Sequence, residues 1–244
     1  NFSHEKKVYK SILSLMKKYS EIWSQPRNLK SDKWEHYFDI YDHCLSRFYD
    51  KKISFLEIGI QNGGSIEVAQ KLFDPKSSLS GLDIDPRCSD ISNILKDVKI
   101  YIGSQVDEQL LNKIASDHNK NFDVIIDDGS HIQSHMIFTF TRMFQFINDG
   151  GVYLIEDTHT NYSPSHQESF FGIGLYDYFK GLSERLNLDY MDPASRQRYK
   201  IPRNQRDKRD YHNDINHFIF SIEFFDSIIA IRKKQKLEPL RIQK

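Results

Sequence analysis

Residues 53–65 read ISFLEIGIQNGGS, and the fold of the chain can be inferred outward from this stretch. Ile53 to Leu56 form a short apolar run that ends at Glu57; glycines follow, and a helical pattern begins at Ser65. A buried strand that turns sharply into a helix has this pattern, with glycine where a side chain would block a ligand. The spacing differs from the G-x-G-x-x-G dinucleotide fingerprint, and no Gly-Lys-Ser/Thr follows as in a phosphate-binding loop. Taken alone, such a turn is more often structural than functional.

Length and composition indicate one α/β domain with appendages, since the chain has 244 residues. Lys plus Arg and Asp plus Glu number 34 each, so charge gives no reason to expect nucleic acid or a membrane as the main partner. The two cysteines, Cys44 and Cys88, lack zinc-type spacing, and we interpret them as free thiols of a cytoplasmic protein. No apolar run has the length of a membrane span, and the N-terminal residues lack the apolar stretch of a signal peptide.

The chain divides into an N-terminal helical extension over 1–50 and a main domain over 51–244. Apolar residues at helical spacing predict an amphipathic helix over 5–22, which either lies on the main domain or forms an oligomer contact. Ser31 to Glu35 resembles a capping box that opens a helix running to Phe48, whose aromatic residues we assign to core packing. Three polar residues at its start are candidates for a lip over a ligand: Asp32, Lys33 and His36.

A second strand is predicted at 79–83, and it ends in an acidic residue. Asp83 stands about 20 residues past the glycine turn, where nucleotide-type sites hold the ribose hydroxyls. Asp85 precedes a proline, as at a helix start, so we favour a functional role for Asp83 and a capping role for Asp85. The loop after a third strand at 98–102 lies beside the first strand. Its candidates for contact with a base are Ser104, Gln105 and Asp107.

Acidic pairs follow two further predicted strands. The strand at 122–126 ends in Asp127-Asp128-Gly129-Ser130-His131, a helix over 133–148 follows, and the strand at 152–155 ends in Glu156-Asp157-Thr158-His159. Parallel strands present their carboxyl ends at one edge, where ligands of open α/β sheets bind. Four acids without a cation would repel one another, which favours a divalent metal. The alternative is that two acids cap helices and the others are solvated.

The C-terminal part adds a helix over 175–186 and two antiparallel strands at 217–223 and 227–231 that close the far edge of the sheet. Between them, residues 195–214 are rich in arginine and lysine. Such a segment is usually a solvated loop. The sharper interpretation is a lid over an anionic acceptor.

The motifs LEIGIQNGGS, GLDIDP, IIDDGSH and IEDTHTNY, in this order and spacing, resemble those of class I S-adenosylmethionine-dependent methyltransferases. More narrowly, they resemble the metal-dependent sugar O-methyltransferases of macrolide and polysaccharide tailoring, the mycinamicin and rhamnosyl group. The resemblance covers about 32–187 and the final strand pair. It implies an α/β, Rossmann-like sheet of seven strands in the order 3-2-1-4-5-7-6, with the last strand antiparallel and helices on both faces.

The resemblance also implies roles for individual residues. Glu57, Gly59 and Gly63 would line the methionine end of S-adenosylmethionine, and Asp83 would hold its ribose. Gln105 and Asp127 complete the expected cofactor-binding set. The implied ligands of Mg²⁺, or of another divalent cation, are Asp128, Glu156 and Asp157. His131 matches the general base; His159 is the second candidate, although a histidine beside ligand carboxylates is at least as typical of a residue that orients them.

The expected function is therefore methyl transfer to a hydroxyl of a sugar, on a polysaccharide, nucleotide-sugar or glycosylated natural product. Residues 161–167 and the arginine-rich segment depart from the family pattern where the acceptor would be selected. Two alternatives stay open. One is a phosphate-like or other small polar acceptor, for which Arg203, Arg206 and Arg209 are candidates; the other is a non-catalytic binding module with the same fold. We also expect a small-molecule or glycan partner and, from the N-terminal helix, self-association.

Overall fold

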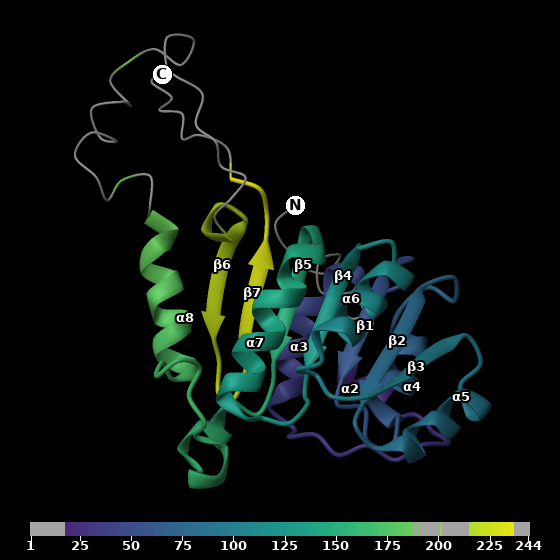
Figure 1. The fold of residues 1–244 in the computed structure, drawn as a ribbon. Coiled ribbons are helices and arrows are strands. Elements are labelled where there is room, and N and C mark those ends of the chain that lie inside the picture. Colours follow the sequence, from purple (N-terminus) through teal and green to yellow (C-terminus); the bar gives the residue numbers. More distant parts are fainter. Residues whose placement is uncertain (1–17, 188–189, 191–200, 202–214, 237–244) are drawn as a thin grey trace.

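Seven strands form one sheet in the order β3-β2-β1-β4-β5-β7-β6 (Figure 1). The computed structural model describes residues 18–187, 190, 201 and 215–236. Strands β1 to β5 pair in parallel, whereas β7 is antiparallel to both β5 and β6. The strands are β1 (Ser54–Ile58), β2 (Ser78–Asp83), β3 (Val98–Ile102), β4 (Phe122–Asp127), β5 (Ile147–Ile155), β6 (Ile219–Phe224) and β7 (Ile229–Lys233). The predicted order and the predicted antiparallel last strand are both confirmed.

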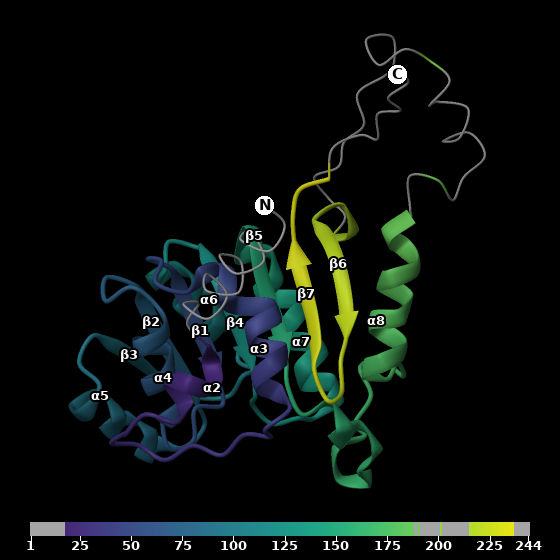
Figure 2. The ribbon, with the colours of Figure 1, turned by 180° about the vertical axis from the view of Figure 1, so that it is seen from behind.

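Helices cover both faces of this sheet, as the opposite views in Figures 1 and 2 show. The α-helices are α2 (Tyr19–Trp23), α3 (Tyr37–Leu45), α4 (Gly64–Leu72), α5 (Ile91–Ile94), α6 (Glu108–Asp117), α7 (Gln133–Met143) and α8 (Leu175–Glu184). The short 3-10 helices are η1 (Ser46–Phe48), η2 (Pro86–Asp90), η3 (Phe144–Phe146), η4 (Thr158–Tyr162), η5 (Pro164–His166), η6 (Arg185–Asn187) and η8 (Ile215–His217).

The strands alternate their side chains between two hydrophobic cores, one on each face. In β1, Phe55 belongs to the core shared with α2, α3, α4 and α5, whereas Leu56 belongs to the core shared with α6, α7 and α8. In β4, Ile126 faces the first core and Ile125 the second. The N-terminal segment thus contributes α2 and α3 to one face of the sheet. The same alternation sets the face of the sheet toward which each acidic residue near a strand end points.

Two helix predictions are wrong in their extent. The capping box at Ser31 does not open a helix, because α3 begins only at Tyr37 and its N-cap residue, His36, makes no side-chain capping hydrogen bond. The helix predicted to reach Asn148 ends at Met143, and β5 begins at Ile147 because the chain there pairs with β4. By contrast, Asp85 caps η2 by accepting a hydrogen bond from the Arg87 backbone N–H, as predicted.

Some expectations lie outside the described residues. Of the predicted helix over 5–22, residues 1–17 are not described, and most of the arginine-rich segment is likewise outside the described ranges. Cys44 and Cys88 are both free thiols, as predicted. None of the helices in the described part of the chain combines the length and the apolar character of a bilayer-spanning segment.

Candidate active site

The turn after β1 lies directly against the turn after β4. Gly59 has a φ of +82°, and a Cβ at this position would lie 2.0 Å from the backbone oxygen of Asp128. The Asp128 backbone N–H donates to the carbonyl of Ile58 at 2.8 Å, so main chain packs against main chain here. Glycine at residue 59 is therefore required by its left-handed conformation and by this close approach.

Gly63 and Gly64 serve the same turn in other ways. Gly63, at φ +80°, is the N-cap residue of α4, and a Cβ there would crowd the side chains of Ile91 and Leu29. The Gly64 N–H donates to the carbonyl of Lys30, to which a Cβ would come within 2.4 Å. These two glycines are explained by packing. A direct contact of Gly63 with a cofactor stays a prediction.

Two cavities meet beside this turn, at the carboxyl ends of the central strands. The larger, of about 510 Å³, contacts Gly59, Gln61, Asp83 and Gly129 together with the acidic residues described below. The smaller, of about 150 Å³, is lined in part by Gly59, Asp83, Gly129 and Gln105. Asp83 thus stands between a polar cavity and a narrower, more apolar one, and its predicted contact with a ribose stays a prediction. Its two carboxylate oxygens accept the backbone N–H groups of Gln61 and Asp85.

Gln105 and Asp127 form a buried pair behind the smaller cavity. The Gln105 side-chain N–H donates to Asp127 Oδ1 at 3.1 Å, and its Oε1 accepts the Ser130 backbone N–H at 2.7 Å. Tyr153 donates its hydroxyl to the other Asp127 oxygen at 3.0 Å. Burial raises the pKa of Asp127 to about 7. Its described contacts are internal, because strand alternation points it away from α3, so Asp127 orients Gln105; direct cofactor binding by Asp127 stays a prediction.

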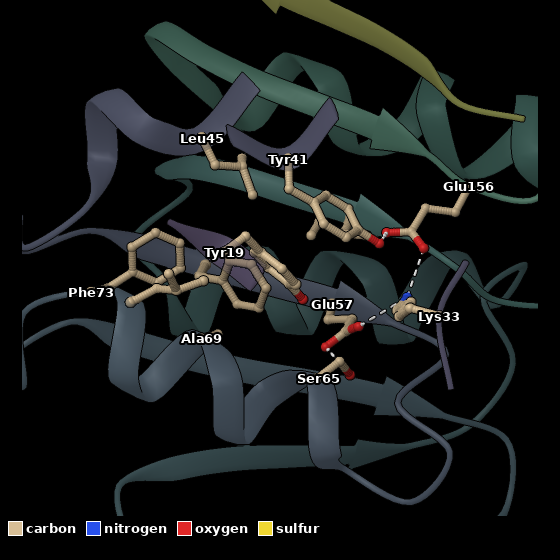
Figure 3. A pocket seen from close by; sticks show the side chains of 12 residues that line it. Tyr19, Lys33, Tyr41, Leu45, Glu57, Ser65, Ala69, Phe73 and Glu156 are labelled. Carbon is tan, nitrogen blue, oxygen red and sulfur yellow. Dashed lines mark hydrogen bonds and ion pairs between the residues drawn. The ribbon is translucent and has the colours of Figure 1, made fainter. Parts of the chain in front are cut away.

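Glu57, one residue before the end of β1, lies on the opposite face of the sheet from Asp127 and is 1% exposed. It accepts a hydrogen bond from the Ser65 hydroxyl at 2.8 Å, and its other oxygen lies 3.9 Å from Lys33 Nζ. Figure 3 shows Lys33 between Glu57 and Glu156, with Tyr41 reaching toward Glu156 from above. Burial raises the pKa of Glu57 to about 7. One lysine, Lys33, therefore lies beside Glu57 of β1 and beside the acids that follow β4 and β5.

Glu57, Asp128, Glu156 and Asp157 form an acidic cluster, and three donors from the segment before β1 contact it. Lys33 Nζ lies 2.5 Å from Asp128 Oδ2 and 2.6 Å from Glu156 Oε2. Tyr37 donates its hydroxyl to Asp157 Oδ1 at 2.6 Å, and Tyr41 donates to Glu156 Oε1 at 2.7 Å. The three donors are spaced four residues apart, so on α3 the two tyrosines lie on one helix face. Lys33 was predicted as part of a lip over a ligand and the two tyrosines as core residues; the i, i+4, i+8 spacing of Lys33, Tyr37 and Tyr41 is the sequence signal of their shared role.

Charge in this cluster remains out of balance. Burial alone would lower the pKa of Lys33, but the carboxylates of Glu156 and Asp128 hold it well above its ordinary value. The pKa values of the carboxyl groups rise as well, because burial raises that of Asp128 to about 6 and that of Glu156 to about 7. The argument for a metal assumed that no side-chain cation accompanies the acids, and Lys33 supplies one. One lysine cannot neutralise three ionised carboxylates, and the raised pKa values mean that protonation removes part of this surplus of negative charge near neutral pH.

Among the described residues, Asp128, His131 and Asp157 form a group that could hold a metal ion. One ligand atom from each lies within 4.8 Å of the other two. His131 Nε2 lies 3.9 Å from Asp128 Oδ1 and 3.8 Å from Asp157 Oδ2. Each carboxylate therefore gives one oxygen to the donors on the α3 side, Lys33 or Tyr37, and presents the other toward His131. This donor set fits a divalent cation.

Glu156, predicted as the third ligand, is placed differently. It is fully buried, and its two oxygens are occupied by Lys33 and Tyr41. The structure thus brings Asp128 and Asp157 to His131, whereas Glu156 lies one step deeper, in contact with the same lysine as Asp128. Its role as a metal ligand stays a prediction.

The two candidate histidines differ in their surroundings. His131 has a φ of +57°, and burial lowers its pKa, which favours the neutral imidazole. Its Nδ1 is buried and has no hydrogen-bond partner among the described residues. Thr160 donates its hydroxyl to the His131 backbone carbonyl at 3.2 Å. His159 is half-exposed, lies 4.0 Å from Asp157 Oδ1 and packs edge-on against Trp34. His131 is thus the histidine held inside the cluster.

Comparison with known proteins gives relatives of one kind. The chain is 36% identical over 147 residues to L-olivosyl-oleandolide 3-O-methyltransferase of Streptomyces antibioticus, a match to 56% of this chain and 37% of that protein. It is 34% identical over 148 residues to 8-demethyl-8-(2-methoxy-alpha-L-rhamnosyl)-tetracenomycin-C 3'-O-methyltransferase of Streptomyces olivaceus, covering 56% of this chain and 36% of the relative. The matches thus span little more than a third of these relatives. No protein-family model matches the chain.

Among solved structures, the fold matches the MycE methyltransferase of the mycinamycin biosynthetic pathway, solved with Mg, S-adenosylhomocysteine (SAH) and mycinamycin VI. The TM-score is 0.68 at 24% identity, and the match covers 91% of this chain and 55% of that one. At this identity the likeness concerns the fold. The chain therefore has the class I methyltransferase fold, and 56% of its sequence is similar to the two O-methyltransferases named above.

Proposed function

We propose that the chain is an S-adenosylmethionine-dependent O-methyltransferase that acts on a sugar hydroxyl with the help of a divalent cation. The relatives support the reaction class, since they are named as O-methyltransferases of olivosyl and rhamnosyl compounds. The observation that carries the proposal is the meeting of Asp128, His131 and Asp157 beside the cavity that contacts Gly59 and Asp83. A methyl donor and a cation-bound acceptor would thereby lie next to one another.

S-adenosylmethionine is proposed to occupy the two joined cavities. Asp83 would accept hydrogen bonds from the ribose hydroxyls, because it stands between the cavities and its carboxylate has acceptor capacity beyond its two backbone partners. The base would enter the smaller cavity beside Gln105. The methionine end would extend past Gly59 toward Lys33 and Glu57. The close approach at Gly59 leaves no room for a larger residue beside the backbone of Asp128.

A divalent cation such as Mg²⁺ is proposed to bind Asp128 and Asp157, with Glu156 as a further ligand. Carboxylate oxygens are the ligands that such hard cations prefer, and the cluster has more negative charge than Lys33 can neutralise. When bound, the cation supplies Lewis acidity that favours the deprotonated form of an acceptor hydroxyl. Lys33 and Tyr37 fix the positions of the two carboxylates, so that the oxygens facing His131 are oriented before the ion arrives.

His131 is proposed to accept the proton of the acceptor hydroxyl at Nε2. The imidazole must be neutral to do so, and burial favours that state by lowering its pKa. Its position is held through the Thr160 contact with its backbone. A well-placed base typically contributes roughly 10²–10⁴-fold in rate. Alignment of the acceptor oxygen with the transferable methyl group would supply much of the rest.

The test combines binding and turnover. Calorimetric titration with S-adenosylmethionine should detect binding. A methyl-transfer assay on rhamnosides and olivosides should detect formation of S-adenosylhomocysteine. EDTA should abolish this activity, and Mg²⁺ should restore it. His131→Asn should keep both cofactor and cation binding while it loses transfer. Loss of cation binding in that variant would make His131 a ligand. Absence of heat with S-adenosylmethionine would favour the non-catalytic module.

A further inference from the structure

A separate cavity lies beside the candidate active site, and nothing described above uses it. Its volume is about 500 Å³, and it is lined by residues of η4, of the start of α8 and of the end of β6. Its walls include Gln133, Asn161, Tyr162, Tyr176, Lys180 and Phe224. We call it the aromatic pocket. Residues 161–167, which depart from the family pattern, supply two of its walls.

Three aromatic rings form a stack in this pocket. The rings of Tyr162 and Tyr176 are 6.1 Å apart with planes at 29°, and those of Tyr176 and Phe224 are 6.3 Å apart at 25°. Tyr162 is 74% exposed and Phe224 is 42% exposed. Aromatic rings left this open present flat, polarisable faces whose negative charge density attracts C–H groups. The apolar face of a pyranose ring offers such C–H groups.

The pocket also contains polar groups suited to hydroxyls. Asn161 and Gln133 line the pocket as polar residues. Gln133 is ordered by donating to the Asn161 carbonyl and by accepting the Leu175 N–H. Asp177 and Lys180 both line the pocket, so its wall has no single sign of charge. A wall of stacked rings and polar side chains without a single sign of charge favours a neutral, hydroxyl-bearing ligand over an anionic one.

Two hydrogen bonds join the pocket to the candidate site. Thr158, which follows Asp157 directly, shares a 3.0 Å hydrogen bond with the Tyr176 hydroxyl. Thr160 donates to the His131 carbonyl and is followed by Asn161 and Tyr162. One short 3-10 helix, η4, therefore connects a predicted metal ligand with the pocket wall.

We propose that the aromatic pocket binds the sugar ring next to the one that is methylated, so that the acceptor has at least two rings. This inference rests on the proposed function, because it deepens the substrate class of that site. The methylated ring would lie at His131, and its neighbour would lie against Tyr162 and Tyr176. The pocket, rather than the cation site, would then select among acceptors.

The test compares methyl glycosides of L-rhamnose and D-glucose with the matching disaccharides, by saturation-transfer NMR and by KM and kcat. The wild-type chain should bind a disaccharide more tightly than its monosaccharide. Tyr162→Ala and Phe224→Leu should reduce that preference about tenfold in KM while kcat on monosaccharides changes little. Phe220→Leu is the matched control, because Phe220 lies on β6 as Phe224 does, is 58% exposed and does not line the pocket.

The outcomes separate this inference from the reaction itself. Binding of a disaccharide that is lost in Tyr162→Ala, without methyl transfer to any saccharide, would support the pocket and contradict the reaction. Transfer that proceeds equally well on one ring and two would support the reaction and overturn the pocket. The proposal is also overturned if no saccharide binds the wild-type chain, or if the Phe220 control loses as much as the pocket variants.

Discussion

Lys33 Nζ lies 2.6 Å from Glu156 Oε2, and this contact joins the segment before β1 to the end of β5 across 123 positions of sequence. Both side chains are buried, and the same lysine also contacts Asp128 and approaches Glu57. The lysine therefore neutralises part of the acidic cluster when no metal is bound. It also ties the position of the predicted ligands to the N-terminal segment.

Lys33→Met should destabilise the chain and make its stability depend on metal. Breaking a buried ion pair by removing one partner costs about 3–5 kcal/mol, because the carboxylates are left without their cation. We expect a lower melting temperature in EDTA than for the wild-type chain, and a larger rise on addition of Mg²⁺. Lys71→Met is the control, since Lys71 is partly exposed and pairs with Glu67 away from the cluster. An unchanged melting temperature in EDTA would show that Lys33 is not needed there.

Tyr37→Phe should weaken cation binding roughly tenfold, the lower end of what is typical when an outer-shell partner of a metal ligand is removed. The reason is that Asp157 loses the hydroxyl that fixes its Oδ1. Calorimetric titration with Mg²⁺ measures the change. Tyr49→Phe removes a comparable hydroxyl–carboxylate contact, 2.7 Å to Asp42, and should leave cation affinity unaltered. Equal affinities in the two variants would contradict the assigned role of Tyr37.

Gly59→Ala should destabilise the fold by roughly 3 kcal/mol or more, because a left-handed residue with a Cβ is strained and this Cβ would overlap the Asp128 carbonyl. Gly150→Ala is a matched comparison. Gly150 also has a positive φ, at +85°, but a Cβ there meets nothing within 4 Å. We expect about 1 kcal/mol for that change, from backbone strain alone. Urea denaturation measures the free energy of unfolding of both variants. Similar losses would show that the turn at Gly59 is not in close contact with the turn at Asp128.

His118 should make the fold sensitive to acid. Burial lowers its pKa to about 4, from an ordinary value of 6.5, and its Nδ1 lies 2.8 Å from the Ser54 hydroxyl. Between these two pH values the unfolded chain binds a proton at His118 that the folded chain does not, so stability falls as the pH is lowered. The full effect is about 3 kcal/mol. Between pH 6.5 and pH 4, the free energy of unfolding of His118→Gln, measured by urea denaturation, should fall less than that of the wild-type chain. Parallel losses would contradict the assignment.

Local signals in the sequence were sufficient for the strands, and the resemblance supplied their order in the sheet, but neither placed the side chains that meet at the edge of the sheet. The apolar runs and glycine turns predicted β1 to β5 because strand period and turn chemistry are local properties. The helix expected from Ser31 failed because residues before Tyr37 are instead held by contacts far along the chain, of which Lys33 with Asp128 and Glu156 is the strongest. Charge complementarity between segments about 100 residues apart follows from the fold and cannot be inferred from spacing alone.

The acidic residues illustrate the same limit. Neighbouring positions Asp127 and Asp128 differ in environment, because Asp127 ends a strand and faces α7 and Tyr153, whereas Asp128 begins the turn beside Gly59. The pairing of carboxylates at two strand ends was predictable from the parallel sheet. Which oxygen of each carboxylate is free, and that Glu156 contacts Lys33, required the structure.

The most direct test is a crystal structure of the chain with S-adenosylhomocysteine and Mn²⁺, in which the anomalous signal locates the ion. The account predicts one anomalous peak in contact with Asp128 and Asp157, with the nucleoside between Asp83 and Gln105 and the sulfur turned toward His131. An ion elsewhere, or S-adenosylhomocysteine outside the cavity beside Gly59, would contradict the proposal that this cluster positions an acceptor for methylation.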